Sequence, residues 1–267
     1  MIAAILAWLT DPASWRGTDG IPHRLGEHLW YSGLSVLIAA VLAIPLGLWI
    51  GHTGRGRSVV AVANSLRAVP SLGLLFALSM WAGPRLHGDA AFLAPTIVAL
   101  AVLAVPPLLS GAYSGVDAVD PAARDAAKGM GMPPGRVLRE VELPCALPLL
   151  LSGLRSAVLQ VIATATIAAY LSIGGLGRFL IDGIAVQDYA QTAGGAVLVA
   201  LLALAVDLLL AGLTRLVVSP GLTGRGTRRL TRGRDTSAVT DSATPPTREA
   251  TLARTSDHAP DPSPTQN

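Results

Sequence analysis

Cysteine, aromatic side chains and charge are all scarce in this sequence. Cys145 is the only cysteine of the 267 residues, which excludes an intrachain disulfide and a cysteine-based metal site. Aromatic residues make up 4%, too few for a surface that stacks bases, so we expect no nucleic-acid partner. Charged residues make up 14%, against about 25% in a soluble domain. With 51% hydrophobic residues and a mean hydropathy of +0.53, the chain indicates a bilayer-facing surface.

Catalytic and metal-binding patterns are also missing. The five histidines are scattered, no pair has metal-ligand spacing within one helix, and no nucleophile elbow is present. "GHTGRGRS" at 51–58 has the spacing of a phosphate loop, but a membrane-length run precedes it and Arg57 replaces the lysine. We therefore predict a glycine-rich turn there, and a chain that is not an enzyme and holds no metal or cofactor.

Five apolar segments are each close to the roughly 20 residues that a spanning helix needs. They run over 29–50, 59–81, 91–113, 146–171 and 193–218. The second to fourth contain prolines, which membrane bundles tolerate where neighbours re-satisfy the backbone. Abundant glycine and alanine allow close helix packing. The fold class we predict is an all-α membrane protein with about five transmembrane helices.

Basic residues gather in alternate loops. Loop 51–58 holds two arginines, loop 114–145 holds four basic residues and the stretch 225–234 holds five arginines. Loops 82–90 and 172–192 hold one arginine each. Because basic residues near span ends favour the cytoplasmic side, we expect the N-terminus outside and the C-terminus cytoplasmic.

Three regions follow from these patterns. Residues 1–27 are expected to be a periplasmic segment; a short interfacial helix with Trp8 and Trp15 at headgroup depth is favoured over an amphipathic anchor or a disordered start. Residues 28–220 form the transmembrane domain. Residues 221–267 are rich in Ser, Thr, Pro and Asp, so we predict a disordered cytoplasmic tail.

A few polar residues lie within the apolar segments. Arg67 either marks a functional site or extends its charge to the inner interface. Asp207 either pairs inside the bundle or lines a wet cavity. We predict that a translocation path is lined by Asn64, Arg67, Pro70, Gln160, Thr164 and Thr166. For Gln160, Thr164 or Thr166 taken singly, an interhelical hydrogen bond is the favoured explanation, and the path is favoured for the three together.

The charged loop at 120–144 carries the signals of a folded element. Asp120 is a good N-cap, Pro121 suits the first helical position, and Gly129 and Gly131 offer a stop. We predict a short helix over 122–128, a turn at 133–135 and a second short helix over 136–143, after which Pro144 begins the return to the membrane.

The spacing in this loop is that of a known motif. "DAA" at 125–127 is followed by three residues, Gly131, nine residues, Val141, one residue and then "LP". It resembles the EAA loop of binding-protein-dependent ABC importer permeases, of the type I (MetI-like) core. Asp and Val stand where Glu and Ile are usual. The resemblance implies a cytoplasmic coupling-helix loop that docks on an ATPase subunit through the following residues: Asp125, Ala126, Ala127, Gly131, Val141, Leu143 and Pro144.

Further stretches narrow the resemblance. "RAVPSLGLL" at 67–75, "VELPCALPLLLSGLR" at 141–155, "QVIATATIAAY" at 160–170 and "GGLG" at 174–177 look like permeases of osmoprotectant importers, which carry glycine betaine, carnitine, choline or related compounds. The resemblance implies four partners: an ABC ATPase subunit, an extracytoplasmic substrate-binding protein, a second permease chain and membrane lipid. It places the chain in the plasma membrane of a bacterium. We see no aromatic cage in the spans, so selectivity should reside in the binding protein.

Three alternatives stay open. The same machinery can carry another small solute such as methionine, phosphonate or a sulfonate. An ion-coupled secondary transporter needs no ATPase, but it often has inverted repeats, and only Asp207 offers an intramembrane carboxylate. A membrane enzyme needs a paired catalytic constellation, which the sequence does not offer.

Overall fold

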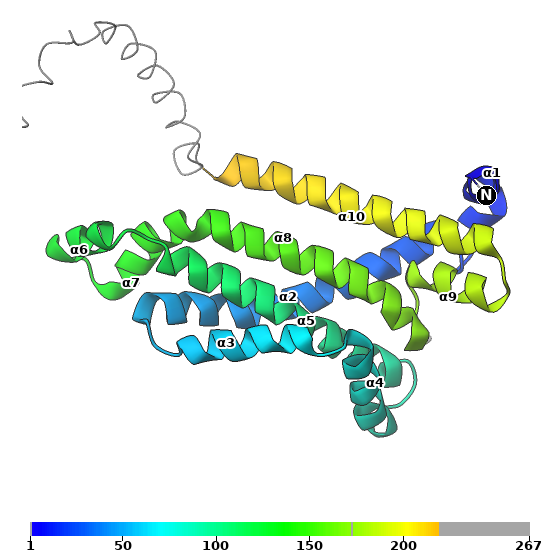
Figure 1. The fold of residues 1–267 in the computed structure, drawn as a ribbon, viewed down its shortest axis with the longest axis horizontal. Helices are drawn as coiled ribbons and strands as arrows, with labels where there is room; N and C mark the ends of the chain where they lie inside the picture. Colours follow the sequence, from blue (N-terminus) through cyan, green and yellow to red (C-terminus); the bar gives the residue numbers. More distant parts are fainter. Residues whose placement is uncertain (1, 172, 219–267) are drawn as a thin grey trace, which may run out of the picture. The chain divides into compact units, whose positions relative to one another are not determined.

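The computed structural model describes residues 2–171 and 173–218, and the predicted tail at 221–267 lies outside them. The described part consists of helices and their connections, with no strand among them. Its helices are α1 Ile2–Thr10, α2 Ile21–Thr53, α3 Arg57–Ser65, α4 Ser71–Ala82, α5 Ala90–Asp117, α6 Pro121–Gly129, α7 Pro134–Val137, α8 Leu143–Ala168, α9 Gly177–Ala185 and α10 Tyr189–Val217 (Figure 1).

The number of spans agrees with the sequence. By length and composition four helices can cross a bilayer: α2, α5, the continuous helix Pro134–Leu171 and α10. The pair α3 and α4 makes a fifth if its bent halves count as one span. The prediction of an all-α membrane protein with about five transmembrane helices is therefore confirmed.

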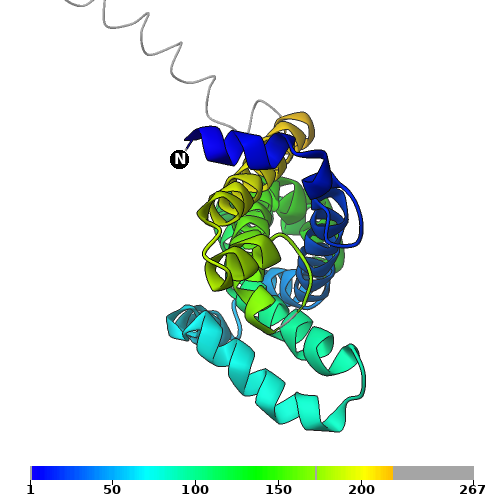
Figure 2. The same cartoon turned by 90° about the vertical axis from the view of Figure 1, so that its right-hand side faces the viewer.

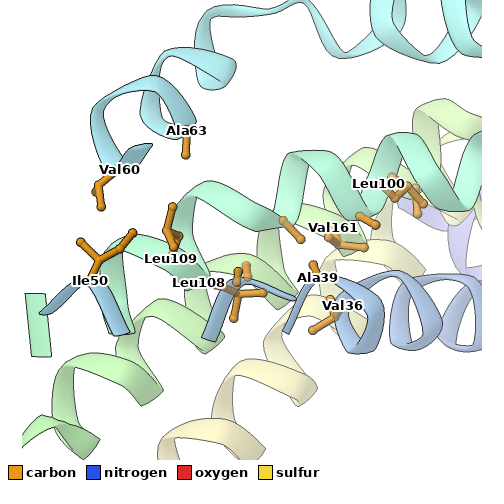
Figure 3. Close-up of a cluster of buried hydrophobic side chains, with 14 residues drawn as sticks. Val36, Ala39, Ile50, Val60, Ala63, Leu100, Leu108, Leu109 and Val161 are labelled. Atoms are coloured by element: carbon orange, nitrogen blue, oxygen red, sulfur yellow. The ribbon is translucent and has the colours of Figure 1, made fainter. Parts of the chain in front are cut away.

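Helix α5 is the centre of the bundle, packed against α2 on one side and α8 on the other. In its most apolar window 67% of the residues are buried, whereas none are in α10. The main core joins Val36 and Ala39 of α2, Leu100 and Leu108 of α5, and Val161 of α8 (Figure 3). Large apolar side chains of α10 such as Leu208, Leu209 and Leu216 are therefore exposed, available to lipid or a partner, while those of α5 hold the chain together.

Glycines let these helices meet backbone to backbone. A β-carbon on Gly153 of α8 would lie 2.6 Å from the carbonyl oxygen of Pro107 and 2.9 Å from the Cα of Gly111. A β-carbon on Gly51 of α2 would lie 2.7 Å from the Cβ of Val116. Since lipid offers no hydrophobic drive for helix association, this close van der Waals contact is the main source of cohesion.

The second apolar segment, predicted over 59–81, is bent in the middle. Helices α3 and α4 meet at 95°, and α4 projects from the bundle (Figure 2). Between them Val69 is extended, with φ −73° and ψ 126°. Pro70 explains the break, because its ring disfavours a helical conformation in the preceding residue and it has no N–H to donate.

The "GHTGRGRS" stretch is a connection between two helices. Helix α2 continues to Thr53, Gly54 ends it with φ +69°, and α3 begins at Arg57. A helix rather than a strand precedes the glycines, so the stretch has the glycine-rich turn that we predicted and not the setting of a phosphate loop.

At the end of the bundle opposite to the 51–58 connection, the N-terminal residues pack against α9. Helix α1 is followed by a short 3-10 turn, and α2 begins at Ile21, ahead of residue 28. The Trp8 ring meets the Phe179 ring of α9 edge to face, with centroids 5.2 Å apart. Trp15 is half exposed and its indole N–H donates to the Leu9 carbonyl at 2.7 Å.

The close approach of α5 and α8 generates a stability prediction. We expect Gly153→Ala to lower the melting temperature of the purified protein by about 2–12 °C, because the new methyl group meets fixed backbone atoms. Gly212→Ala in α10 is the matched control, since a β-carbon there meets no atom within 4 Å. Equal melting temperatures for the two variants would contradict this packing.

Candidate functional site

The charged loop folds into a capped helical elbow at one end of the bundle, beyond the ends of α2 and α5 (Figure 1). The Asp120 carboxylate accepts a hydrogen bond from the Ala122 N–H at 2.9 Å, which starts α6 as the sequence predicts. At the other end Gly131 has φ +82°. A β-carbon there would meet no atom within 4 Å, so the left-handed backbone selects glycine.

The second half of the elbow differs from the prediction of a separate helix over 136–143. Helix α7 passes through one π-turn, Leu138–Glu142, directly into α8, so the chain is helical from Pro134 to Leu171. The Leu143 N–H donates to the Leu138 carbonyl, five residues back. Pro144 has no N–H, and the wider turn immediately before it carries the chain past the missing donor without a break.

The residues assigned to the coupling motif divide by exposure. Asp125, Ala126 and Gly131 are exposed, and the Asp125 carboxylate has only a 3.7 Å contact with Lys128 on its own helix. Val141 and Leu143 are half-buried and Pro144 is exposed. Ala127 is 2% exposed, so its small size serves packing within this chain and not the approach of a partner.

A buried carboxylate, which was not among the residues predicted from the sequence, lies beneath the elbow. Glu142 is 2% exposed, and its Oε2 accepts a 2.6 Å hydrogen bond from Nδ1 of His52, the next-to-last residue of α2. Its Oε1 forms a 3.1 Å ion pair with Nε of Arg124 in α6. The Arg124 guanidinium also donates to the Val116 carbonyl of α5. One feature of the sequence could have revealed Glu142: it is acidic and lies two positions before Pro144, at the start of a long apolar helix.

Gln160 has a structural role that its neighbours explain. Its side-chain amide donates to the Leu103 carbonyl of α5 at 2.9 Å. The usual donor to that carbonyl is the N–H four residues later, but position 107 is proline. Gln160 therefore supplies the hydrogen bond that Pro107 cannot make, and joins α8 to α5.

The other residues of the predicted path occupy two separate helical regions. Asn64 on α3 accepts a 3.0 Å hydrogen bond from the Ser110 hydroxyl of α5. Arg67 is exposed in the short turn after α3, and Pro70 lies at the bend before α4. On α8, Thr164 donates to the Gln160 carbonyl at 2.8 Å and Thr166 to the Ala163 carbonyl at 2.6 Å, so both hydroxyls bond their own helix.

Asp207 is paired within the chain. Arg155 of α8 makes two hydrogen bonds to its carboxylate across to α10, Nε to Oδ1 at 2.5 Å and Nη2 to Oδ2 at 2.6 Å. Of the alternatives that the sequence left open, the structure therefore favours pairing. Two planar groups in this fork geometry hold α10 against α8.

Aromatic and acidic side chains meet around a cavity of about 310 Å³ at the end of the bundle opposite to the elbow. Arg24 there pairs with two carboxylates, Glu27 at 3.0 Å and Asp19 at 2.5 Å. Glu27 also accepts from the Gly175 N–H at 2.9 Å. The sequence showed no aromatic cage within the spans; this cavity, at the end of the bundle, is lined by Tyr31 and Phe92 together with Glu27 and Asp89.

These features define a polytopic helical membrane protein with a folded polar elbow exposed at one end. The chain belongs to the family described as binding-protein-dependent transport system inner membrane component, which matches residues 43–219. It is thus a multi-pass plasma-membrane protein and a transport subunit, as the resemblance of the charged loop led us to expect.

Relatives with similar sequences have names from one branch of this family. The glycine betaine/carnitine/choline transport system permease protein OpuCB of Bacillus subtilis is 32% identical over 204 residues, covering 76% of this chain and 90% of the relative. The osmoprotectant import permease protein OsmW of Salmonella typhimurium is 33% identical over 200 residues, covering 73% and 91%. The choline transport system permease protein OpuBB of Bacillus subtilis is 31% identical, covering 75% and 89%.

Solved structures share the fold. One inward-facing structure of the MetNI methionine ABC transporter matches with a TM-score of 0.66 at 22% identity, covering 74% of this chain and 96% of that chain. An amino acid ABC transporter with histidines matches with a TM-score of 0.53 at 18% identity, covering 79% and 96%. The predicted type I (MetI-like) permease core is therefore confirmed as a fold.

The contact between Gln160 and the proline-freed carbonyl can be tested by a double-mutant cycle. We expect Gln160→Leu to destabilise the protein by about 0.6–2 kcal/mol, the worth of an interhelical hydrogen bond in a membrane bundle. In a Pro107→Ala background the N–H at position 107 is restored, so the same substitution should cost clearly less. Melting temperatures of the four proteins give the coupling, and equal costs in both backgrounds would rule out this role.

Proposed function

We propose that this chain is the permease subunit of an ATP-driven importer of osmoprotectants of the glycine betaine, carnitine and choline type. The observation that carries the proposal is the exposed elbow with the EAA spacing at the end of a family-typical bundle. A separate ABC ATPase subunit supplies the energy, and this chain converts its closure into movement of the spans.

The elbow is suited to docking because it is rigid and protrudes. Its helix is capped at both ends, and a polar face with Asp125 and Ala126 is exposed. Met130 at its tip is 72% exposed, so an apolar side chain is available there for a partner to cover. A groove on the ATPase that receives α6 would cover this side chain and accept the Asp125 carboxylate.

The proposed orientation has the elbow and the C-terminus in the cytoplasm and the N-terminus outside. It rests on the basic loops, two of which are joined here: Arg57 at the start of α3 pairs with Asp117 at the end of α5 at 3.0 Å. Both loops therefore belong to one end of the bundle, as the cytoplasmic side requires.

The transport cycle follows from this arrangement. A loaded extracytoplasmic binding protein docks on the outer loops, and two permease chains, identical or sister, form the pore within the lipid. ATP binding closes the ATPase subunits, the elbows move and the bundle opens outward; ADP release resets it. In this scheme a solute path passes Asn64, Arg67, Pro70, Thr164 and Thr166, with Gln160 stabilising the wall of the path.

The cargo class is supported by the relatives, whose names include glycine betaine, carnitine and choline. The outer cavity is a second support, because aromatic residues and the carboxylates of Glu27 and Asp89 line it, a composition that suits a quaternary ammonium group. The competing cargoes are methionine, phosphonate and sulfonates. The test is uptake of radiolabelled glycine betaine and choline by the reconstituted complex, with each competitor in excess. Uptake that only methionine or a sulfonate competes away would contradict the cargo assignment.

An ion-coupled transporter is the less favoured alternative. Its candidate carboxylate, Asp207, is held by two hydrogen bonds from Arg155. Uptake that follows an ion gradient and continues without ATP would replace the importer proposal.

Docking of the elbow on the ATPase yields a direct prediction. We expect Gly131→Arg to lose the co-purifying ATPase, because a long charged side chain would occupy the face on which α6 docks. Gly54→Arg is the matched control: Gly54 also has a positive φ, and a β-carbon there would also meet no atom within 4 Å, but it lies in the other inner loop. Co-purification followed by mass spectrometry measures the result, and equal ATPase recovery from both variants would oppose elbow docking.

A further inference from the structure

We propose that Arg124, Glu142 and His52 form a clamp that transmits movement of the elbow to the first long helix of the bundle. The inference rests on the proposed function, because it names the residues through which that function's mechanical step passes. We call these three residues the Glu142 clamp.

Helix α6 is attached to the rest of the bundle by few side chains. Within the described residues, every side-chain hydrogen bond or ion pair from α6 to another helix starts at Arg124. The pair between Lys128 and Asp125 stays within α6, and the Asp120 cap bonds its own helix. Apolar packing adds Ala127, which is buried. A displacement of α6 therefore acts on the bundle through the polar contacts of Arg124, the packing of Ala127 and the chain connections at its ends.

Glu142 carries the carboxylate that pairs with Arg124. Glu142 is 2% exposed, so the polar contacts of its carboxylate come from protein groups. Its two oxygens face different helices: Oε1 is 3.1 Å from Arg124 Nε of α6, and Oε2 is 2.6 Å from His52 Nδ1 of α2. Since a carboxylate only accepts, the imidazole donates its Nδ1–H. One buried group thus joins the elbow to the inner end of α2.

The backbone that carries the Glu142 carboxylate is irregular. Glu142 is the last residue of the π-turn between α7 and α8, a kind of irregularity that often marks functional sites in helices. Beside it, Gly51 of α2 packs directly on Val116 of α5, whose carbonyl also accepts from Arg124. Arg124 thus contacts both the Glu142 carboxylate and the end of α5, and a shift of Arg124 is passed to α2 through Glu142 and His52.

The carboxylate of the Glu142 clamp and the proposed docking surface lie on different parts of the elbow. Asp125, Ala126 and Gly131 are exposed on the elbow, whereas the carboxylate of the clamp is buried beneath it. A change in the clamp should therefore leave binding of the ATPase intact and break only the transmission. This outcome differs from that of a substitution on the docking face.

The experiment uses the full complex of permease, ATPase and binding protein in proteoliposomes. ATP hydrolysis and radiolabelled glycine betaine uptake are measured together, with saturating loaded binding protein. We expect Glu142→Gln to retain the ATPase and its hydrolysis but to raise the ATP consumed per solute by about tenfold, within the range of coupling between sites. Glu140→Gln is the matched control, because Glu140 is exposed and bonds only Arg136 on its own helix.

A second pair of variants covers the case in which Glu142→Gln does not fold. His52→Asn keeps an N–H donor near the position of Nδ1, so we expect the wild-type ratio of ATP to solute. His52→Leu removes the donor, so we expect a raised ratio with normal ATPase recovery. A purely structural role of His52 would lower the amount of complex without changing that ratio.

The possible results separate the two proposals. A wild-type ratio in both Glu142→Gln and His52→Leu overturns the clamp and leaves the importer standing. If Glu142→Gln yields no complex, a wild-type ratio in His52→Leu alone overturns it. Absence of ATP-driven uptake in the wild-type complex overturns the proposed function, and the clamp with it.

Discussion

The close approach of α2, α5 and α8 is the contact on which the rest of this structure depends. Gly111 and Gly153 bring the backbones of α5 and α8 together, and Gly51 does the same for α2 against α5. Lipid gives no hydrophobic incentive for such contacts, so their energy comes from dispersion at short range and from the few hydrogen bonds that cross between helices. A bundle held in this way is stiff at its centre, and its moving parts are expected at its edges.

The closely packed helices α5 and α8 also contain or adjoin backbone irregularities. Three prolines lie within α5, and Gln160 of α8 supplies a donor to the carbonyl that Pro107 leaves without its usual partner. The π-turn before Pro144 achieves the same end inside one helix. Because the donors lost at Pro107 and Pro144 are compensated locally, the bundle keeps its packing at both places, and the elbow mounted on the π-turn is a capped unit at its end.

The sequence was informative where the physics is local. Apolar run lengths predicted the spans, and Asp120, Pro121 and Gly131 predicted the limits of α6. The sequence was less informative about features that depend on contacts between residues far apart in the chain. Pro70 was expected to be tolerated inside one span, and the 95° bend there was not predicted. No local pattern near Ala127 indicates that its side chain is buried. The link between His52 and Glu142 spans 90 residues and depends on how α2 and α8 meet, which no local pattern encodes.

The central claim is that the elbow is the contact point of an ATPase, and a cross-link tests it most directly. Cys145→Ser removes the only cysteine, so a single Met130→Cys can carry a photoactivatable reagent at the tip of the elbow. Met80→Cys on α4, 78% exposed, provides an equally accessible control far from it. The account predicts an adduct with a P-loop ATPase subunit from Met130→Cys and none from Met80→Cys. No ATPase adduct at position 130, in membranes where the complex is intact, would contradict it.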